Sequence, residues 1–346
     1  GVTPSRSPLE TKGLTDARTE CWPGGLPIDA AEWHGVRMSD RDTLLNAIAR
    51  DQLGLFTMAQ ARACGFPSST VSDRTSAGAY DRVHPGIYGV AGGADSWHRD
   101  VMAGVLSLAE PGAASHRTAA FLWGLTDRRS HAIEVVTRRH RRMPRDDLVV
   151  HESLDLRASD IVLVDSIPVT SAPRTLVDLG ASAPIGAVAR CLDAGLRKKL
   201  VTLLDVELFV IRVGRSGRTG VGIIRPLLDE RRTWQGITDS DLEDMFRRIV
   251  DSAPVAMPEA QHRVCEAGGE FVGRFDFAYP ETFSLFELDS EGYHMDPVSF
   301  QRDREKQNRA HTLGWTVYRF TYRQLRDDPD SVIQILASTQ PEYRTD

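Results

Sequence analysis

The sequence predicts an α/β protein of several domains: an N-terminal winged helix-turn-helix, a central α/β domain and a C-terminal domain with the element order αβββαβ. The chain has 346 residues, which is long for one hydrophobic core. Hydrophobic residues make up 41% and charged residues 26%, an ordinary balance for a globular protein. Helical apolar spacing and strand-like alternation occur in separate blocks along the chain, which indicates mixed architecture.

The N-terminal elements follow from capping and turn residues. Residues 1–38 mix Pro, Gly, Ser and charged residues without a sustained period, so we expect a flexible tail. Residues 39–92 are expected to form the winged helix-turn-helix. Its signals are, in order, helical apolar spacing over 44–49, an N-cap at Thr57, an N-cap at Ser68 or Ser69 for a helix over 69–77, and a hairpin over 80–90 with a Pro85-Gly86 turn.

The second short helix of this domain corresponds to the recognition helix of a helix-turn-helix. Hydroxyl and arginine side chains there and on the wing are the candidate DNA contacts: Ser69, Thr70, Ser72, Arg74 and Arg82. Asp73 lies among them and would repel phosphates. Because winged helices also serve as protein-binding modules, the sequence leaves both roles open.

Residues 93–200 predict the central α/β domain. The expected elements are helices near 97–109 and 115–125, strands at 131–137, LVVHESL and DIVLVDSIPVT, and a helical region from APRTLVDLGA to Leu200. His116 begins the second helix, and a capping or core role is favoured over catalysis because no motif places a nucleophile beside it. Residues 201–236, with GRSGRTGVG between two helices, are expected to be a connector with a flexible basic loop.

Charge is distributed unevenly. The formal net charge is -6, but residues 238–346 hold 21 acidic and 12 basic residues, so the remainder of the chain carries +3. Residues 128–145 contain seven arginines and one glutamate. Such a cluster can neutralise phosphates, which makes Arg138, Arg139, Arg141 and Arg142 candidate DNA contacts. The alternative is a solvated, arginine-rich strand edge.

The C-terminal domain, residues 237–346, has the strongest pattern. Ser240 and Glu243 have the spacing of a capping box at the start of a helix with an apolar stripe. Three strand-like segments follow (QHRVCEA, EFVGRFDFAY and FSLFELD), then a helix over 297–313, a strand over 315–320 and a helix over 330–339.

Two strands of this domain carry acidic residues on one face. Glu287 and Asp289 alternate with apolar residues, and a hairpin symmetric about Glu281-Thr282 would place Asp276 opposite Glu287. Opposed like charges destabilise a sheet and raise a carboxyl pKa unless a cation lies between them. The sequence therefore predicts a Mg²⁺ or Mn²⁺ site; the alternative is a solvated sheet face.

Residues 238–328 resemble the very-short-patch-repair-related branch of the PD-(D/E)XK nucleases, whose fold is restriction-endonuclease-like. The resemblance is carried by SDLE (240–243), GRFDFAYP (273–280), FELDSEGYH (286–294), FQRDREKQN (300–308) and GWTVYRFTYRQL (314–325). It implies metal ligands at Asp276, Glu287 and the Leu288 carbonyl, and a catalytic acid at Glu243.

The sequence departs from this family at one position. Asp289 stands where the family's E-x-K motif has lysine, so no positive charge reaches the phosphate from this position. By the resemblance, catalysis would depend on metal, with His294 as a proton shuttle.

The N-terminal half is similar to AbiEi-type antitoxins of toxin–antitoxin systems, over about residues 40–195. The similarity rests on GLFTMAQARACGFPSSTV, RVHPGIYGV and SHRTAAFLWGL. It implies a winged helix joined to an α/β domain and a role as a DNA-binding repressor.

Two functions remain open. One is a metal-dependent deoxyribonuclease in phage defence or DNA repair, which binds DNA through its basic half and cuts it with the acidic domain. The other is a non-catalytic, AbiEi-like antitoxin or transcriptional regulator with a degenerate nuclease fold. A homodimer, which double-strand cleavage would need, and a cognate toxin or defence-system partner are compatible with both.

The expected compartment is the cytoplasm. Mean hydropathy is -0.29, no run of eighteen apolar residues predicts a membrane span, and the first forty residues lack the apolar core of a secretory signal. The four cysteines lie too far apart for a CxxC zinc motif, so free thiols are expected.

Overall fold

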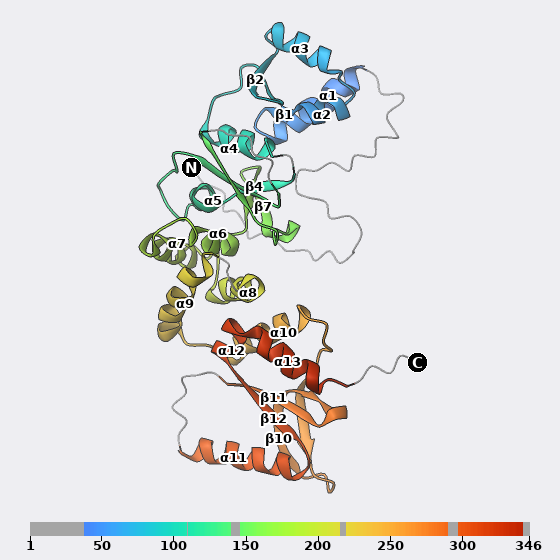
Figure 1. The fold of residues 1–346 in the computed structure, drawn as a ribbon, viewed down its shortest axis with the longest axis vertical. Helices are drawn as coiled ribbons and strands as arrows, with labels where there is room; N and C mark the ends of the chain where they lie inside the picture. Colours follow the sequence, from blue (N-terminus) through green and yellow to red (C-terminus); the bar gives the residue numbers. More distant parts are fainter. Residues whose placement is uncertain (1–37, 109, 140–145, 215–218, 290–296, 342–346) are drawn as a thin grey trace, which may run out of the picture. The chain divides into compact units, whose positions relative to one another are not determined.

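The computed structural model describes residues 38–108, 110–139, 146–214, 219–289 and 297–341 (Figure 1). The chain divides into two compact units, the first formed by Gly1–Gly112 with Leu156–Pro168 and the second by Ala113–Asp155 with Val169–Asp346. The tail predicted over 1–38 falls outside the described residues except for its last position.

The first unit begins with the predicted helices and hairpin and one short strand, β1, that was not predicted: α1 (Met38–Asp51), β1 (Leu55–Thr57), α2 (Met58–Ala63), α3 (Ser68–Ser76), β2 (Tyr80–His84) and β3 (Ile87–Val90). The strands form an antiparallel sheet in the order β1-β3-β2. Thr57 caps α2 as predicted, because its hydroxyl accepts from the Gln60 amide at 3.1 Å while the Gln60 side chain accepts from the Thr57 amide. The unit also contains α4 (Trp97–Leu106), η1 (Ala158–Asp160) and β7 (Ile161–Val164).

The predicted cap of α3 was wrong. The helix starts at Ser68, its N-cap residue is Pro67, and no side chain caps it. The Ser68 hydroxyl instead accepts two hydrogen bonds from the Arg62 guanidinium, at 2.8 and 3.1 Å. This contact links α2 to α3. Beneath them, the apolar core of this domain includes Leu45, Phe56, Val71 and other buried residues.

The second unit begins with a layer of parallel strands and helices. Its elements are β4 (Gly112–Ala114), α5 (His116–Leu122), β5 (Ile133–Thr137), β6 (Leu148–Glu152), β8 (Ile167–Thr170), α6 (Ala172–Leu179) and α7 (Ile185–Arg197). The helices and strands lie close to the predicted positions with two exceptions: β4 was not predicted, and the predicted strand DIVLVDSIPVT forms two strands, β7 and β8. Strands β5 and β6 pair in parallel, as do β4 and β8. The buried pattern of β5 fits a strand covered on both faces.

Helices α8 (Leu203–Val213) and α9 (Val221–Gln235) occupy the predicted connector, but they are part of a hydrophobic core. Val206, Val210 and Ile224 are fully buried in the cluster that α5, α6 and α7 share. Gly180 and Gly220 allow α9 to approach α6. A Cβ on Gly220, whose φ is +98°, would lie 2.2 Å from the Val177 carbonyl oxygen, and a Cβ on Gly180 would lie 2.5 Å from the Gly220 carbonyl oxygen. The central part of the glycine-rich loop lies outside the described residues.

The C-terminal elements follow the predicted order: α10 (Asp239–Asp251), β9 (Glu259–Cys265), β10 (Phe271–Tyr279), η2 (Pro280–Thr282), β11 (Ser284–Asp289), α11 (Pro297–Thr312), β12 (Thr316–Thr321), α12 (Tyr322–Asp327) and α13 (Pro329–Thr339). Neither η2 nor α12 was predicted. The sheet order is β12-β11-β10-β9, with β11 and β12 parallel. Helices α10, α12 and α13 cover one face and α11 the other (Figure 1).

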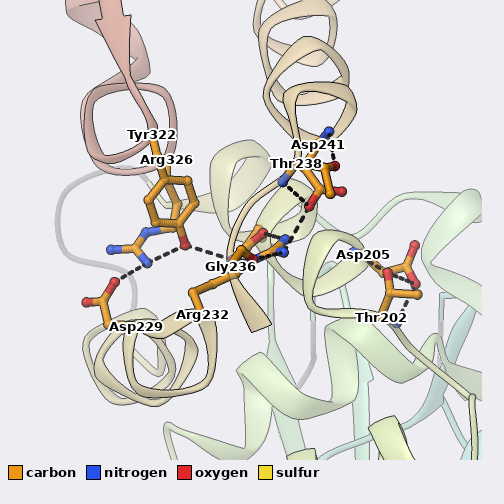
Figure 2. Close-up of polar contacts among 10 residues, drawn as sticks. Thr202, Asp205, Asp229, Arg232, Gly236, Thr238, Asp241, Tyr322 and Arg326 are labelled. Atoms are coloured by element: carbon orange, nitrogen blue, oxygen red, sulfur yellow. Dashed lines mark hydrogen bonds and ion pairs between the residues drawn. The ribbon is translucent and has the colours of Figure 1, made fainter. Parts of the chain in front are cut away.

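A buried polar network joins α8 and α9 to the C-terminal elements (Figure 2). Glu207 on α8 is fully buried and accepts hydrogen bonds from the Arg232 guanidinium and from the Tyr322 hydroxyl. Arg326 donates to the Tyr322 hydroxyl at 2.8 Å and to Asp229 at 2.6 Å. These bonds satisfy charges that would otherwise be costly to bury.

Two further predictions concern thiols and membranes. Cys64, Cys191 and Cys265 are free, as predicted for these three positions. Among the described residues, no helix has both the length and the apolar character needed to cross a bilayer.

Candidate functional site

The acidic residues of β10 and β11 lie in the predicted register. Phe277 pairs with Phe286 and Ala278 with Leu285, so the next step of the hairpin places Asp276 opposite Glu287. The backbone ladder ends there, and the Asp276 carboxylate takes the place of a backbone acceptor: its Oδ2 accepts from the Leu288 amide at 2.9 Å. Leu288 therefore contacts the site through its amide.

The electrostatics of Asp276 agree with the prediction from the sequence. Burial raises the pKa of Asp276, and the negative charges of Glu287 and Glu243 raise this pKa further. The Leu288 hydrogen bond and the Lys306 ammonium act in the opposite direction but do not cancel the increase. Asp276 is thus a carboxyl group whose ionised form is disfavoured until a further positive charge approaches.

Two cations contact Glu287. The Lys306 ammonium, from α11, forms an ion pair with Glu287 Oε1, and the Arg319 guanidinium, from β12, donates to Oε2 at 2.9 Å. Arg319 also binds Asp289, with both oxygens at 3.2 Å, so Asp289 and Glu287 share a face as predicted. Glu287 and Asp289 therefore receive positive charge from a helix and a neighbouring strand, which could not be predicted from the sequence.

Both ends of the Lys306 side chain pack against β10. Its ammonium lies 4.1 Å from the centroid of the Phe275 ring, a cation–π contact. A Cβ on Gly273 would lie 2.7–2.9 Å from three side-chain carbons of Lys306, so this position has room only for glycine while the lysine keeps its place. The GRFDF segment thus supplies Asp276 and also the space for the lysine.

Glu243 does not complete a capping box, so that prediction was wrong. Thr238 and Asp241 cap α10 reciprocally, because Thr238, two residues before Ser240, offers the capping hydroxyl. Glu243 instead accepts from Gln261 at 2.9 Å and from Arg247 at 3.1 Å. Its negative charge contributes to the raised pKa of Asp276. His294 lies outside the described residues.

The candidate DNA contacts of the first unit differ in exposure. Ser69, Ser72 and Arg82 are exposed, and Thr70 is half-buried. Arg74 points inward: it forms an ion pair with Asp42 on α1 and donates to the Tyr80 hydroxyl at 2.8 Å. Arg74 therefore connects α3 to α1 and β2, and its guanidinium is occupied within the domain.

Basic residues of the second unit line a groove of about 970 Å³ beside α5 and α7. Its lining has six basic and two acidic side chains: Arg117, Arg128, Arg129, Arg190, Arg197, Lys198, Asp127 and Asp193. Arg138 and Arg139 follow β5 and are exposed, whereas Arg141 and Arg142 lie outside the described residues. The positive charge predicted from residues 128–145 is thus partly continued by α7.

Comparison with known proteins supports part of this picture. Residues 44–91, which span most of α1 to β3, match a family model described as "Transcriptional regulator, AbiEi antitoxin". The chain is also 27% identical over 213 residues to two proteins of Mycobacterium tuberculosis, "Uncharacterized protein MT2308" of strain CDC 1551 / Oshkosh and "Uncharacterized protein Rv2248" of strain ATCC 25618 / H37Rv. The alignment covers 61% of this chain and 75% of each relative. The predicted AbiEi likeness is confirmed for residues 44–91, and the nuclease likeness stays a prediction.

Proposed function

We propose that this chain is a DNA-binding protein that hydrolyses DNA phosphodiester bonds with a divalent cation held by its C-terminal domain. The observation that carries the proposal is the placement of Asp276 opposite Glu287, which pairs with the Lys306 ammonium, with the charge of Glu243 also acting on Asp276. The match of residues 44–91 to transcriptional regulators supports the DNA-binding part. Phage defence or DNA repair is the biological setting that we propose for such an activity.

The donor set fits Mg²⁺ or Mn²⁺. Asp276 and Glu287 offer carboxylate oxygens from neighbouring strands, the ligands that hard cations prefer. The raised pKa of Asp276 means that a nearby cation would relieve an existing electrostatic cost. When bound, such a cation stabilises the negative charge that develops on the phosphate. Lys306 adds a second positive charge to the same face. Glu243, on α10, accepts a hydrogen bond from Gln261 on β9.

The test is a cleavage assay with the full chain on a panel of DNA forms (supercoiled, nicked, flapped, mismatched and single-stranded) with Mg²⁺ or Mn²⁺. Removing a metal ligand costs several kcal/mol of transition-state stabilisation, so Glu287→Gln should lower the rate at least about a thousandfold. Glu281→Gln, which changes an exposed acid in the same hairpin, should leave the rate unchanged. Equal rates for the two variants would contradict the proposed site.

DNA binding is expected to depend on the arginines after β5. Each phosphate contact contributes about 0.9 to the slope of log affinity against log salt, so Arg138→Ala/Arg139→Ala should reduce the slope by up to about 1.8, at all DNA sequences. Arg50→Ala/Arg248→Ala removes the same charge from exposed positions outside this cluster and should change the slope less. Fluorescence anisotropy over a series of salt concentrations measures both. An unchanged slope in the first variant would remove these arginines from the interface.

A non-catalytic regulator is the second candidate, and one observation favours it. Lys306 and Arg319 already neutralise Glu287, and the Leu288 amide already occupies Asp276, so protein groups satisfy the carboxylates without a metal. In that case the C-terminal domain would be a scaffold, and a cognate toxin or a second copy of the chain would be the expected partner. Binding of DNA without cleavage of any form in the panel, with either metal, would favour this function.

A further inference from the structure

Three chemically active side chains meet in the second unit, away from the carboxylates of the C-terminal domain. They are His116 at the start of α5, Glu134 on β5 and His151 on β6, and one ligand atom from each lies within 4.8 Å of the other two. The parallel register pairs Val136 with His151, and Glu134 precedes Val136 by two residues on the same strand. Glu134 and His151 are therefore diagonal neighbours on one face of the sheet.

The backbone holds His116 against this pair. The Ser115 amide donates to the Glu134 carbonyl at 2.9 Å, and the Glu134 amide donates to the Thr118 hydroxyl at 2.8 Å. His116 itself has φ +49°, a left-handed conformation that is uncommon for residues other than glycine. Such conformations persist where the surrounding structure imposes them, and this one places the imidazole ring 3.6 Å from the ring of His151.

Each group has the chemistry of a metal ligand. His151 Nε2 lies 3.0 Å from Glu134 Oε2, and His116 Nδ1 lies 3.0 Å from the Ser115 hydroxyl. A hydrogen bond to the second ring nitrogen orients a histidine ligand and fixes its tautomer. Glu134 is only 4% exposed and His116 only 5%, so both would bind in a desolvated environment.

One atom of this cluster lacks a donor. Glu134 Oε1 is buried and has no hydrogen-bond partner, and Arg117 Nε is 3.9 Å away, beyond hydrogen-bond distance. A buried carboxylate oxygen without a donor is costly. A cation beside Oε1 would remove that cost, whereas a purely structural hydrogen-bonded trio would leave it.

We infer that His116, Glu134 and His151 bind one Zn²⁺ ion. Two imidazoles and one carboxylate are a ligand set that zinc takes with its fourth position left open, at about 2.0–2.1 Å from each nitrogen. Ligand atoms of a tetrahedral zinc site lie about 3.3 Å apart, so the cluster needs a modest contraction. The His151 side chain, which is partly exposed, is the group free to supply that movement. This site is independent of the proposed cleavage of DNA.

Calorimetric titration of Zn²⁺ into the full chain, after treatment with EDTA, tests the inference. The titration uses the Asp276→Asn/Glu287→Gln background, so that the other carboxylates do not contribute. One equivalent of Zn²⁺ should bind. His151→Gln should weaken binding more than about 100-fold, because changes outside the ligand shell alone cost 10–100-fold. His131→Gln removes an exposed histidine near β5 and should leave the affinity unchanged.

A second measurement guards against variants that fail to fold. Zn²⁺ should raise the melting temperature of the background protein by mass action, and Co²⁺ should give the visible absorption of a four-coordinate site. Both signals should disappear in Glu134→Gln, which keeps the size of the side chain and an acceptor for His151. Zinc binding of equal strength in the background, His151→Gln and Glu134→Gln proteins would overturn the inference, as would the absence of any binding to the background protein.

Discussion

Glu207→Ala is expected to destabilise the second unit by about 3–5 kcal/mol, the cost of removing one partner from a buried ion pair. Glu207 is 0% exposed and accepts from Arg232 at 2.9 Å and from the Tyr322 hydroxyl at 2.7 Å. Without it, the Arg232 guanidinium keeps Asp241 but loses its buried partner. Burial raises the pKa of Tyr322, so its hydroxyl stays protonated and would become a donor without an acceptor toward α8.

Denaturant unfolding followed by circular dichroism measures this effect. Glu230→Ala is the matched control, because Glu230 lies on α9 and its side chain is 67% exposed; its change should stay within about 0.5 kcal/mol. Glu207→Gln should fall between the two, since it keeps an acceptor but loses the charge. If Glu207→Ala were no more destabilising than the control, the network in Figure 2 would contribute little to stability.

Two features explain why α8 and α9, expected to be a connector, could not be predicted as part of a hydrophobic core. A helix apolar on one stripe is readily assigned to one core, but α8 is apolar nearly all round. Its Val206 and Val210 pack with α6 and α7, while Ile211 packs with α10 and the C-terminal strands. The glycines of 214–222 dominate the composition and suggest a loop, although Gly220 is there because α6 and α9 approach so closely.

The C-terminal hairpin was predictable because strand alternation has a period of two and the turn is short. A one-residue slip would exchange the buried Phe286 and the acidic Glu287 between faces, so burial determines the register. Lys306 could not be predicted in the same way. Its approach to Glu287 depends on where α11 crosses the sheet, which involves side chains far apart in sequence.

The cluster of His116, Glu134 and His151 was missed for a similar reason. The sequence does contain a signal: Glu134 is the one charged residue in a strand that is buried throughout. A charged residue at such a position needs a partner. The partner, however, depends on the pairing of β5 with β6, two strands whose order in a parallel sheet the sequence does not specify.

Asp276→Asn is expected to stabilise the metal-free protein at neutral pH and to abolish both cleavage and stabilisation by metal. Folding raises the pKa of Asp276 above 3.8, so the folded protein binds the proton of this carboxyl group more tightly than the unfolded chain does. Stability therefore falls as the pH rises from about 3.8 through the raised pKa, and the full cost is present above it. Asparagine has no such cost and keeps an oxygen for the Leu288 amide.

Metal binding should reverse the order of stability of the wild type and Asp276→Asn. At a Mg²⁺ concentration 100 times the dissociation constant, the wild type should gain about 2.7 kcal/mol and Asp276→Asn almost nothing. Asp244→Asn, a change at an exposed acid of α10, should behave as the wild type does in both conditions. Thermal melts with and without Mg²⁺ or Mn²⁺ measure these differences, and melts near pH 4 should show the advantage of the variant shrinking. A solvated sheet face would give none of these effects, so identical responses of wild type and variant to metal would leave the regulatory function as the better account of the C-terminal domain.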